Sequence, residues 1–291
     1  MEGKRLMTRS VYRSEHGRRA IAASYENTLH RAASAVPLRR RIVPTAFGGT
    51  HILEAGAASD PTLLLLHGTA SNSATWLADI PLWSSRFRVV AADIVGEPGL
   101  SEDRRLTLAS EDASTWLTSL LDELRLERVR IVGMSLGGWI GLHFATRFPG
   151  RVDALSLLAA SGLARQRTSF LFIALPLAMF GAWGLKRINE MACRGVELPE
   201  EAVAFMALVG RHFRPLTEPV PVFTDDELSR LQMPIQLFAG SRDVLLHSDA
   251  SVRRLARLLP HAQTHLLSGC GHVIVGKSED VLGFLSMPRS G

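Results

Sequence analysis

Short, continuously apolar segments alternate with amphipathic helical segments along most of this chain. The apolar runs lie at residues 62–66, 89–92, 129–132, 152–158, 235–239 and 263–267. Helical hydrophobic spacing separates several of them, at residues 108–124, 136–147 and 250–259, and a last helix is expected from about Ser278. Continuous apolar runs are typical of strands buried on both faces of a parallel sheet. The alternation therefore predicts an α/β fold, with a mostly parallel twisted sheet and helices on both of its faces.

Two segments lie outside this alternation. Residues 1–38 are expected to form an N-terminal helical arm, because Ile21, Tyr25 and Leu29 share one face of a helix at residues 15–33. Residues 163–222 are apolar and helical, and they interrupt the strand pattern. We therefore expect an α/β core at residues 39–162 and 223–291, with residues 163–222 inserted as a helical cap.

The cap contains the most apolar stretch of the chain, residues 170–185. It is sixteen residues long, shorter than the roughly 20 residues needed to cross a bilayer. Pro176 and the glycines at 181 and 184 are expected to break it into short helices, so we expect no stable membrane insertion. The sequence predicts that the inner face of these helices lines a substrate pocket. The candidate pocket residues are Phe170, Phe172, Leu175, Met179, Phe180 and Trp183.

Charge is spread unevenly along the chain. Residues 1–41 hold ten Lys and Arg against three Glu, which leaves 23 basic and 25 acidic side chains in the body. The sequence pI of about 9.8 thus describes the arm and does not indicate a basic binding face. We expect no nucleic-acid partner.

Cys193 and Cys270 are the two cysteines of the chain. Two cysteines form neither a disulfide framework nor a four-ligand zinc site. The first ten residues carry basic side chains with no apolar run behind them, so no secretory signal is expected. We expect a cytoplasmic protein without a metal or other cofactor; the sequence leaves open whether it forms a homodimer.

The motif that carries chemistry is Gly133-Met134-Ser135-Leu136-Gly137, which fits G-x-S-x-G. It follows an apolar strand directly and precedes a helical run directly. In that context the serine lies on a sharp turn, and the flanking glycines leave room for it. Ser135 is therefore the candidate nucleophile. The alternative is a Gly-rich strand–helix turn with a chance serine; a dinucleotide-binding loop would need glycine where Ser135 stands.

A serine nucleophile needs a base and an acid. After a G-x-S-x-G turn between a strand and a helix, these follow along the sequence in the order Ser, acid, His. His272 follows the strand at residues 263–267 on a glycine-rich loop, and Asp243 follows the strand at residues 235–239. We predict His272 as base and Asp243 as the acid that orients it. Asp249 is the rival acid, although its position fits the first turn of the next helix.

Two backbone N–H groups are expected to stabilise an oxyanion, those of Leu136 and Thr69. Leu136 follows the nucleophile, and Thr69 lies in the loop after the strand at residues 62–66. His67 is expected to brace that loop. The turn-rich loop from Asp93 to Ser101 is also expected to be a braced loop, because its acids lack the spacing of a calcium site.

These residues resemble α/β-hydrolases, and more narrowly the bacterial carboxylesterases of the NP type. The general match covers His67-Gly68, Asp93–Ser101, Gly133–Gly137, Gly240–Asp243 and Gly269–His272. The narrower match covers Tyr12–Arg18, Val43–His51 and Val222–Leu228. The resemblance implies ester hydrolysis without a cofactor and a helical cap over the pocket. Residues 163–222 match least.

The sequence thus predicts a serine carboxylic ester hydrolase that acts on small-molecule esters with an apolar moiety through an acyl-enzyme. An acyltransferase, a lactonising enzyme and a carbon–carbon bond hydrolase would use the same triad, so these alternatives remain open. A non-catalytic ligand receptor is the alternative from another class. Dehalogenases and epoxide hydrolases need a carboxylate where this chain has Ser135.

Overall fold

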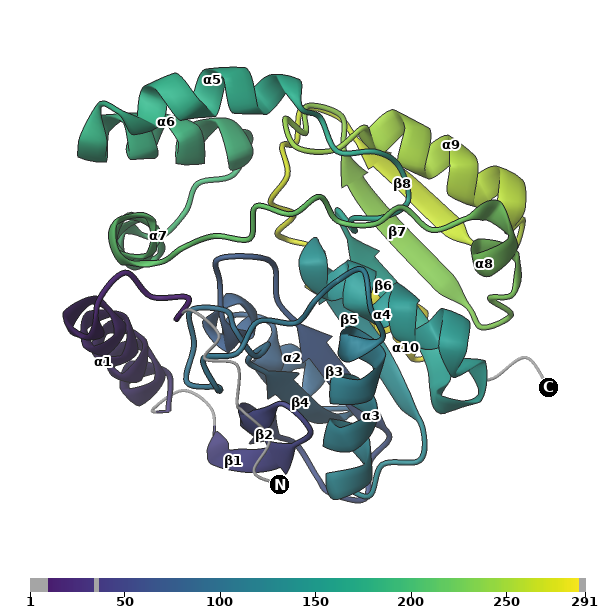
Figure 1. The fold of residues 1–291 in the computed structure, drawn as a ribbon. Helices are drawn as coiled ribbons and strands as arrows, with labels where there is room; N and C mark the ends of the chain where they lie inside the picture. Colours follow the sequence, from purple (N-terminus) through teal and green to yellow (C-terminus); the bar gives the residue numbers. More distant parts are fainter. Residues whose placement is uncertain (1–9, 34–36, 288–291) are drawn as a thin grey trace, which may run out of the picture.

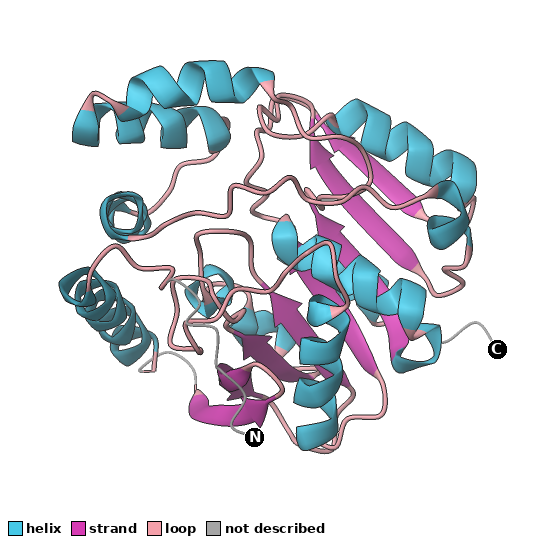
Figure 2. Cartoon of the chain, in the orientation of Figure 1, coloured by secondary structure: helices cyan, strands magenta, loops and turns pink. Residues whose placement is uncertain are grey.

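An eight-stranded sheet forms the centre of the molecule in the computed structural model, which describes residues 10–33 and 37–287. The strand order is β1-β2-β4-β3-β5-β6-β7-β8 (Figures 1 and 2). Neighbouring strands from β4 to β8 are parallel, whereas β1 and β2 add an antiparallel edge. The predicted α/β fold with a mostly parallel sheet is confirmed.

The elements agree with the sequence pattern to within a few residues. The strands are β1 Arg39–Thr45, β2 Gly48–Ala55, β3 Thr62–Leu66, β4 Arg88–Ala92, β5 Val129–Met134, β6 Val152–Leu158, β7 Ile235–Gly240 and β8 Gln263–Leu267. The α-helices are α1 Glu15–Ala32, α2 Ile80–Trp83, α3 Asp112–Glu123, α4 Leu136–Arg147, α5 Ser169–Ala178, α6 Gly181–Ala192, α7 Glu200–His212, α8 Asp225–Ser229, α9 Ser248–Leu258 and α10 Ser278–Leu285. Two 3₁₀ helices lie at Ser73–Trp76 and Pro149–Arg151.

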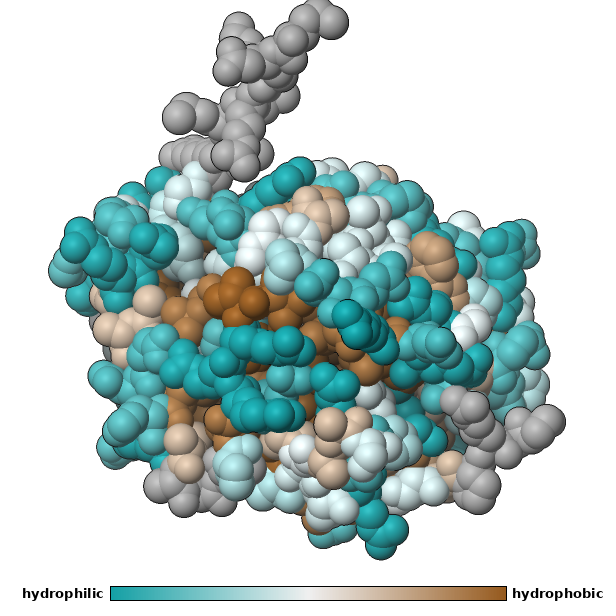
Figure 3. Space-filling model, turned by 90° about the horizontal axis from the view of Figure 1, so that it is seen from below, coloured by the Kyte–Doolittle hydropathy of each residue, from teal (hydrophilic) through white to brown (hydrophobic). Residues whose placement is uncertain are grey.

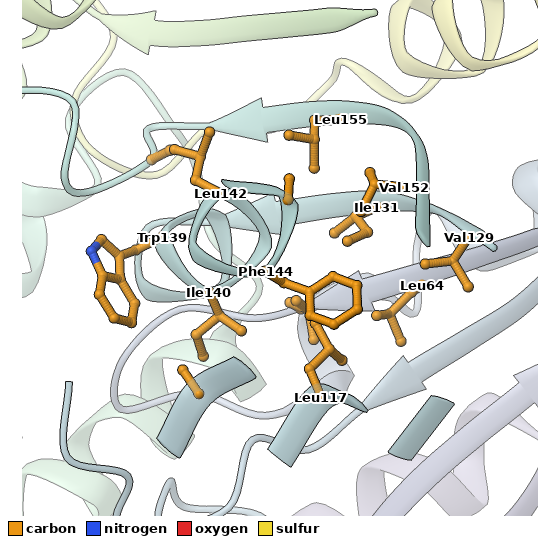
Figure 4. Close-up of a cluster of buried hydrophobic side chains, with 14 of the residues drawn as sticks. Leu64, Leu117, Val129, Ile131, Trp139, Ile140, Leu142, Phe144, Val152 and Leu155 are labelled. Atoms are coloured by element: carbon orange, nitrogen blue, oxygen red, sulfur yellow. The ribbon is translucent and has the colours of Figure 1, made fainter. Parts of the chain in front are cut away.

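The central strands are buried on both faces, and their alternating side chains enter two different cores. Leu64 and Leu66 of β3 pack with α3, α4 and α9, whereas Leu63 and Leu65 pack with α1, α2 and α10. This division follows from the period of two along a strand. Figure 4 shows the first core, in which residues of α4 such as Phe144 lie between the sheet and α3.

The N-terminal arm is folded onto the body through α1. The Ser14 side chain accepts the Gly17 N–H and so caps the helix start. Ile21, Tyr25 and Leu29 are buried on one face, as their spacing predicts, and α1 packs beside α7 (Figure 1). The rest of the expected arm includes residues 1–9 and 34–36, which lie outside the described residues.

Tyr25 connects this arm to the core, because its hydroxyl donates to the buried Asp93 carboxylate at 3.0 Å. We expect Tyr25→Phe to lower the free energy of unfolding by about 2 kcal/mol, the usual range for a hydrogen bond to a charged group. Urea unfolding measures this. Tyr12→Phe is the matched control, since its hydroxyl lies 3.4 Å from the Gly99 carbonyl oxygen, and it should lose less. Equal losses in both variants would contradict the assignment of Tyr25.

Helices α5, α6 and α7 lie between β6 and β7 within residues 163–222, where the sequence predicts a helical insertion, and the short α8 follows them. The predicted break at Pro176 is wrong, because α5 continues through Pro176 to Ala178. The predicted break at Gly181 is confirmed: the chain turns at Phe180–Gly181, where Gly181 has a φ of 59°. Gly184 is not a hinge: a Cβ there would lie 1.6 Å from the Leu177 carbonyl oxygen, so it allows α6 to pack closely against α5.

The outer surface carries both apolar and hydrophilic side chains. Figure 3 views the molecule from below and shows a band of apolar side chains across a mostly hydrophilic face. Within the described part of the chain, no helix combines the length and the apolar character needed to cross a bilayer.

Candidate active site

Ser135 occupies the sharp turn between β5 and α4. Its φ of 51° lies in the left-handed region, which a non-glycine residue adopts rarely and at a cost in free energy. Both flanking glycines are required by close packing. A Cβ on Gly133 would lie 2.6 Å from the Gly137 carbonyl oxygen, and a Cβ on Gly137 would lie 2.1 Å from the Leu66 carbonyl oxygen. The G-x-S-x-G pattern therefore has a steric reason here.

His272 lies between the other two predicted catalytic side chains. Its Nε2 is 2.9 Å from Ser135 Oγ, and its Nδ1 is 2.8 Å from Asp243 Oδ2. An Nδ1–H that donates to the carboxylate leaves Nε2 as the acceptor for the serine hydroxyl. The structure thus brings Ser135, His272 and Asp243 together in one hydrogen-bonded chain.

The carboxylate of Asp243 is held by its own loop as well as by His272. Asp243 Oδ1 accepts the N–H groups of Leu245 and Leu246 at 2.7 and 3.0 Å. Burial by itself raises the pKa of Asp243, but the hydrogen bond with His272 and the two backbone donors outweigh it and lower the pKa below its usual value. The rival Asp249 is 59 % exposed and pairs with Arg253.

The inserted helices hold the histidine loop in place. The Gly271 N–H donates to the Arg194 carbonyl oxygen at 2.7 Å, and the His272 N–H donates to that of Ala192 at 2.8 Å. A Cβ on Gly271 would lie 2.7 Å from the same Ala192 oxygen, so glycine permits this approach. The end of α6 therefore fixes the backbone that carries the imidazole.

The two segments that carry the predicted oxyanion donors lie next to the nucleophile. Leu136 is the first residue of α4, so its N–H has no carbonyl partner within the helix. Thr69 follows Gly68, where a Cβ would come within 3.4 Å of the Ser135 Cβ. The Gly68 backbone and the start of α4 thus lie beside Ser135, and the assignment of the Thr69 and Leu136 N–H groups as oxyanion donors stays a prediction.

The loop after β4 carries two buried carboxylates. Asp93 accepts the N–H groups of Ser73 and Leu100 and contacts His51 Nδ1, at 2.9 to 3.0 Å. Burial raises the pKa of Asp93, but the hydrogen bond with His51 and the other donors outweigh it and hold the pKa at about 2. Glu97 differs: burial raises its pKa to about 7, although the Ala70 N–H and the charge of Arg105 lower it. The sequence indicated a braced loop but did not distinguish these two carboxyl groups.

The raised pKa of Glu97 makes stability depend on pH. The carboxyl group of Glu97 has a pKa of 4.5 in the unfolded chain and about 7 in the folded protein. Its contribution to the free energy of unfolding is therefore fully present below pH 4.5 and is lost as the pH rises through 7. The loss is on the order of 3 kcal/mol. Glu97→Gln cannot ionise, so we expect its free energy of unfolding to increase by that amount relative to wild type between pH 4.5 and 8. Urea unfolding of wild type and Glu97→Gln across this pH range measures the difference in their free energies of unfolding. If that difference does not change with pH, the raised pKa of Glu97 is refuted.

The predicted pocket residues do not lie together. Phe170 is 8 % exposed and lines a cavity of about 270 Å³ beside Asp243, together with Ile173, Met191 and Arg194. The prediction is wrong for four others, which are exposed to solvent and not enclosed in a pocket. They are Phe172, Met179, Phe180 and Trp183. The Leu175 side chain lies outside the described part of the structure.

The reason for this difference is the direction of the side chains on α5. Residues 170, 174 and 177 share the face that is turned inward, and residues 172, 176 and 179 share the opposite face. An apolar sequence without a polar stripe does not indicate which face is buried. Phe180 and Trp183 then follow at the turn into α6, where their rings pack edge to face at 6.0 Å.

Comparison with known proteins supports the same description of the fold. Residues 63–283 match the model of the alpha/beta hydrolase family. Carboxylesterase YbfK of Bacillus subtilis is 30% identical over 249 residues, which cover 80% of this chain and 81% of that protein. Its crystal structure, as CesB, superimposes with a TM-score of 0.81 at 27% identity over 93% of this chain and 99% of that one. The crystal structure of naproxen esterase (carboxylesterase NP) from Bacillus subtilis gives 0.78 at 26% identity over 91% and 98%.

These relatives confirm the expected resemblance to carboxylesterases of the NP type and the class of serine ester hydrolase. The family match covers most of the sheet and the whole inserted region. It also spans Ser135, Asp243 and His272. The chain belongs to the alpha/beta hydrolase family.

Proposed function

We propose that the protein hydrolyses carboxylic esters with an apolar moiety, with Ser135 as nucleophile, His272 as base and Asp243 as orienting acid. One observation carries the proposal: His272 is within hydrogen-bond distance of both partners, at 2.9 Å from Ser135 Oγ and 2.8 Å from Asp243 Oδ2. A hydroxyl becomes an effective nucleophile near neutral pH only with a base at this distance. The carboxylesterase relatives agree with this chemistry.

The reaction follows from the positions of these groups. Ser135 Oγ attacks the acyl carbon while its proton moves to His272 Nε2, and the negative charge of Asp243 stabilises the resulting imidazolium. The N–H groups of Thr69 and Leu136 donate to the oxyanion. The tetrahedral intermediate then breaks its bond to the alkoxy oxygen, and His272 returns the proton to the departing alcohol.

The second half of the reaction repeats these steps with water. His272 removes a proton from water as the water oxygen attacks the acyl carbon of the Ser135 ester. Collapse of this second intermediate breaks the bond to Ser135 Oγ, which regains its proton from His272. The products of this half are a carboxylic acid and the free enzyme.

An apolar substrate moiety would fit the apolar side chains that lie beside the acid loop. Phe170, Ile173 and Met191 line the cavity beside Asp243, and ligand pockets bind mainly through such apolar walls. Residues 163–222 would act as the cap that supplies this wall. A panel of p-nitrophenyl esters of increasing acyl length, with the products identified, tests the function. Acid release without transfer to an added alcohol or amine is expected, whereas dominant transfer would indicate an acyltransferase.

The inward and outward residues of α5 provide a matched pair of variants. We expect Phe170→Ala to shift the preference for longer acyl chains in kcat/KM by about 1–3 kcal/mol, because a void replaces a ring next to the acid loop. Phe172→Ala removes the same side chain from the exposed face, where Phe172 is 79 % exposed, and should leave the preference unchanged. The reverse result would place the substrate on the outer face.

A cytoplasmic location is also proposed. Cys193 and Cys270 are both free, which agrees with a reducing compartment. Fractionation of cells that express the full chain, with detection of the protein in each fraction, tests this location.

A further inference from the structure

The loop that carries Thr69 has an unusual backbone. Ala70, the next residue, has a φ of 58°, in the left-handed region. Such a conformation persists in a non-glycine residue only when neighbouring groups hold it. An oxyanion donor also has to keep its direction, because its effect on the transition state depends on a preorganised geometry. The groups that hold the loop therefore bear on catalysis.

The peptide before Thr69 is held by His67. The His67 Nδ1–H donates to the Gly68 carbonyl oxygen at 2.8 Å, and His67 Nε2 accepts the Ile94 N–H at 2.9 Å. Burial lowers the pKa of His67, which favours the neutral ring that this pair of bonds requires. A peptide group is planar and trans, so the Gly68 carbonyl and the Thr69 N–H point in opposite directions. The hydrogen bond that fixes the Gly68 carbonyl therefore also fixes the direction of the Thr69 N–H.

The peptide after Thr69 is held by Glu97. The Ala70 N–H donates to Glu97 Oε2 at 2.6 Å, a short N–H···O hydrogen bond. The Glu97 backbone is itself fixed, because its N–H donates to the Ile94 carbonyl at 3.1 Å and its carbonyl accepts the Gly99 N–H at 2.8 Å. Glu97 is 4 % exposed, and the proposed proton transfers do not use it.

We propose that Glu97 is a positioning residue of the oxyanion hole, which keeps the Thr69 N–H directed at the reacting carbonyl by holding the Ala70 N–H. With His67 on the other side, both peptide groups that flank Thr69 are fixed. The ψ angle of Thr69 and the φ angle of Ala70 are then set by a side chain from a separate loop. This assignment rests on the proposed function, because it concerns the same oxyanion.

A buried acceptor, and not the negative charge, is what this role requires. Glutamine has a carbonyl oxygen at the same position and can accept the same N–H. Alanine removes the acceptor and leaves the Ala70 N–H buried without its partner. The two substitutions therefore separate positioning from charge.

The test compares Glu97→Ala and Glu97→Gln with wild type in steady-state ester hydrolysis. We expect Glu97→Ala to lower kcat by about 10- to 100-fold with KM within about twofold, because a misdirected donor weakens only the transition state. Glu97→Gln should recover kcat to within about threefold of wild type. If the alanine variant does not fold, Glu97→Met keeps a similar volume without an acceptor and takes its place.

Glu54→Ala is the matched control for a purely structural effect. Glu54 is also 4 % exposed and pairs with Arg41 and Arg88 on the antiparallel edge of the sheet. Its loss should lower the melting temperature and leave kcat within about twofold, since no catalytic group touches it. If Glu97→Ala behaves in the same way, with lower stability and unchanged kcat, the positioning role is overturned. It is also overturned if Glu97→Gln is as slow as Glu97→Ala.

An alkyl boronic acid probes the oxyanion hole directly. Ser135 Oγ forms a bond to boron, the serine proton passes to His272, and the anionic tetrahedral adduct keeps both boron hydroxyls, one of which can occupy the oxyanion position. Its affinity should fall in Glu97→Ala by the same factor as kcat. Unchanged affinity beside a lower kcat would contradict the proposal. Failure of the proposed function is distinguishable, because wild type itself would then hydrolyse no ester and form no adduct.

Discussion

Ser135→Ala is expected to reduce kcat for ester hydrolysis by roughly 10⁴-fold or more while the protein remains folded. The Oγ atom supplies the attacking electron pair, and the turn between β5 and α4 places it 2.9 Å from His272 Nε2. Alanine has no atom that can form the acyl-enzyme. The residual rate would come from binding and the oxyanion donors alone. Steady-state assays on the purified variant, with circular dichroism to confirm folding, measure the loss.

Ser156→Ala is the control for this experiment. Ser156 is fully buried on β6, the strand next to β5, and its hydroxyl donates to Gln236 Oε1 at 3.1 Å. Removing that hydroxyl should affect stability and leave kcat near the wild-type value. A folded Ser135→Ala enzyme with activity within tenfold of wild type would remove Ser135 from the reaction.

Asp243→Asn is expected to lower kcat by about 10³- to 10⁴-fold and to change KM far less. The amide nitrogen introduced at position 243 can donate to His272 Nδ1, which then becomes an acceptor and leaves the proton on Nε2. That tautomer cannot accept the proton of Ser135. The hydrogen bonds from Leu245 and Leu246 to Oδ1 of residue 243 can persist, so the loop should keep its shape.

Asp249→Asn is the natural comparison, because Asp249 was the alternative acid in the sequence. Asp249 lies on α9 with its side chain largely exposed, and its ion pair with Arg253 contributes about 0.3–0.5 kcal/mol at most. We expect wild-type kcat in this variant. A large loss in Asp249→Asn with normal activity in Asp243→Asn would exchange the two assignments.

The fold and the catalytic residues could be predicted because they depend on local sequence patterns. Continuous apolar runs indicated buried parallel strands, and the ends of three of them pointed to Ser135, Asp243 and His272. Because parallel strands end at the same edge of a sheet, loops far apart in the sequence meet there. The distances of 2.8 and 2.9 Å between these side chains agree with that reasoning.

The pocket could not be predicted in the same way, because α5 is apolar on all sides. Phe170 and Phe172 are chemically identical, yet one is buried and the other exposed. Only packing against the acid loop decides between them. Pro176 was likewise an unreliable boundary, because it lies inside α5 and the helix continues past it to Ala178.

Glu97 shows that a long-range contact of a side chain cannot be predicted from the sequence. Its place in a turn-rich loop suggested a braced acid, but a contact with Ala70 from a loop 27 positions earlier in the chain gives no local signal. The same is true of Tyr25 and Asp93, which are 68 positions apart. Long-range hydrogen bonds of this kind become visible only when the sheet order is known.

The most direct measurement is the site of covalent labelling by a fluorophosphonate, which reacts preferentially with an activated serine hydroxyl. Peptide mass spectrometry of the labelled wild-type protein should find one phosphonyl group, on Ser135, and His272→Ala should label far more slowly. An adduct on another residue, or no adduct in an enzyme that hydrolyses p-nitrophenyl esters, would contradict the assignment of Ser135, His272 and Asp243 as the catalytic triad.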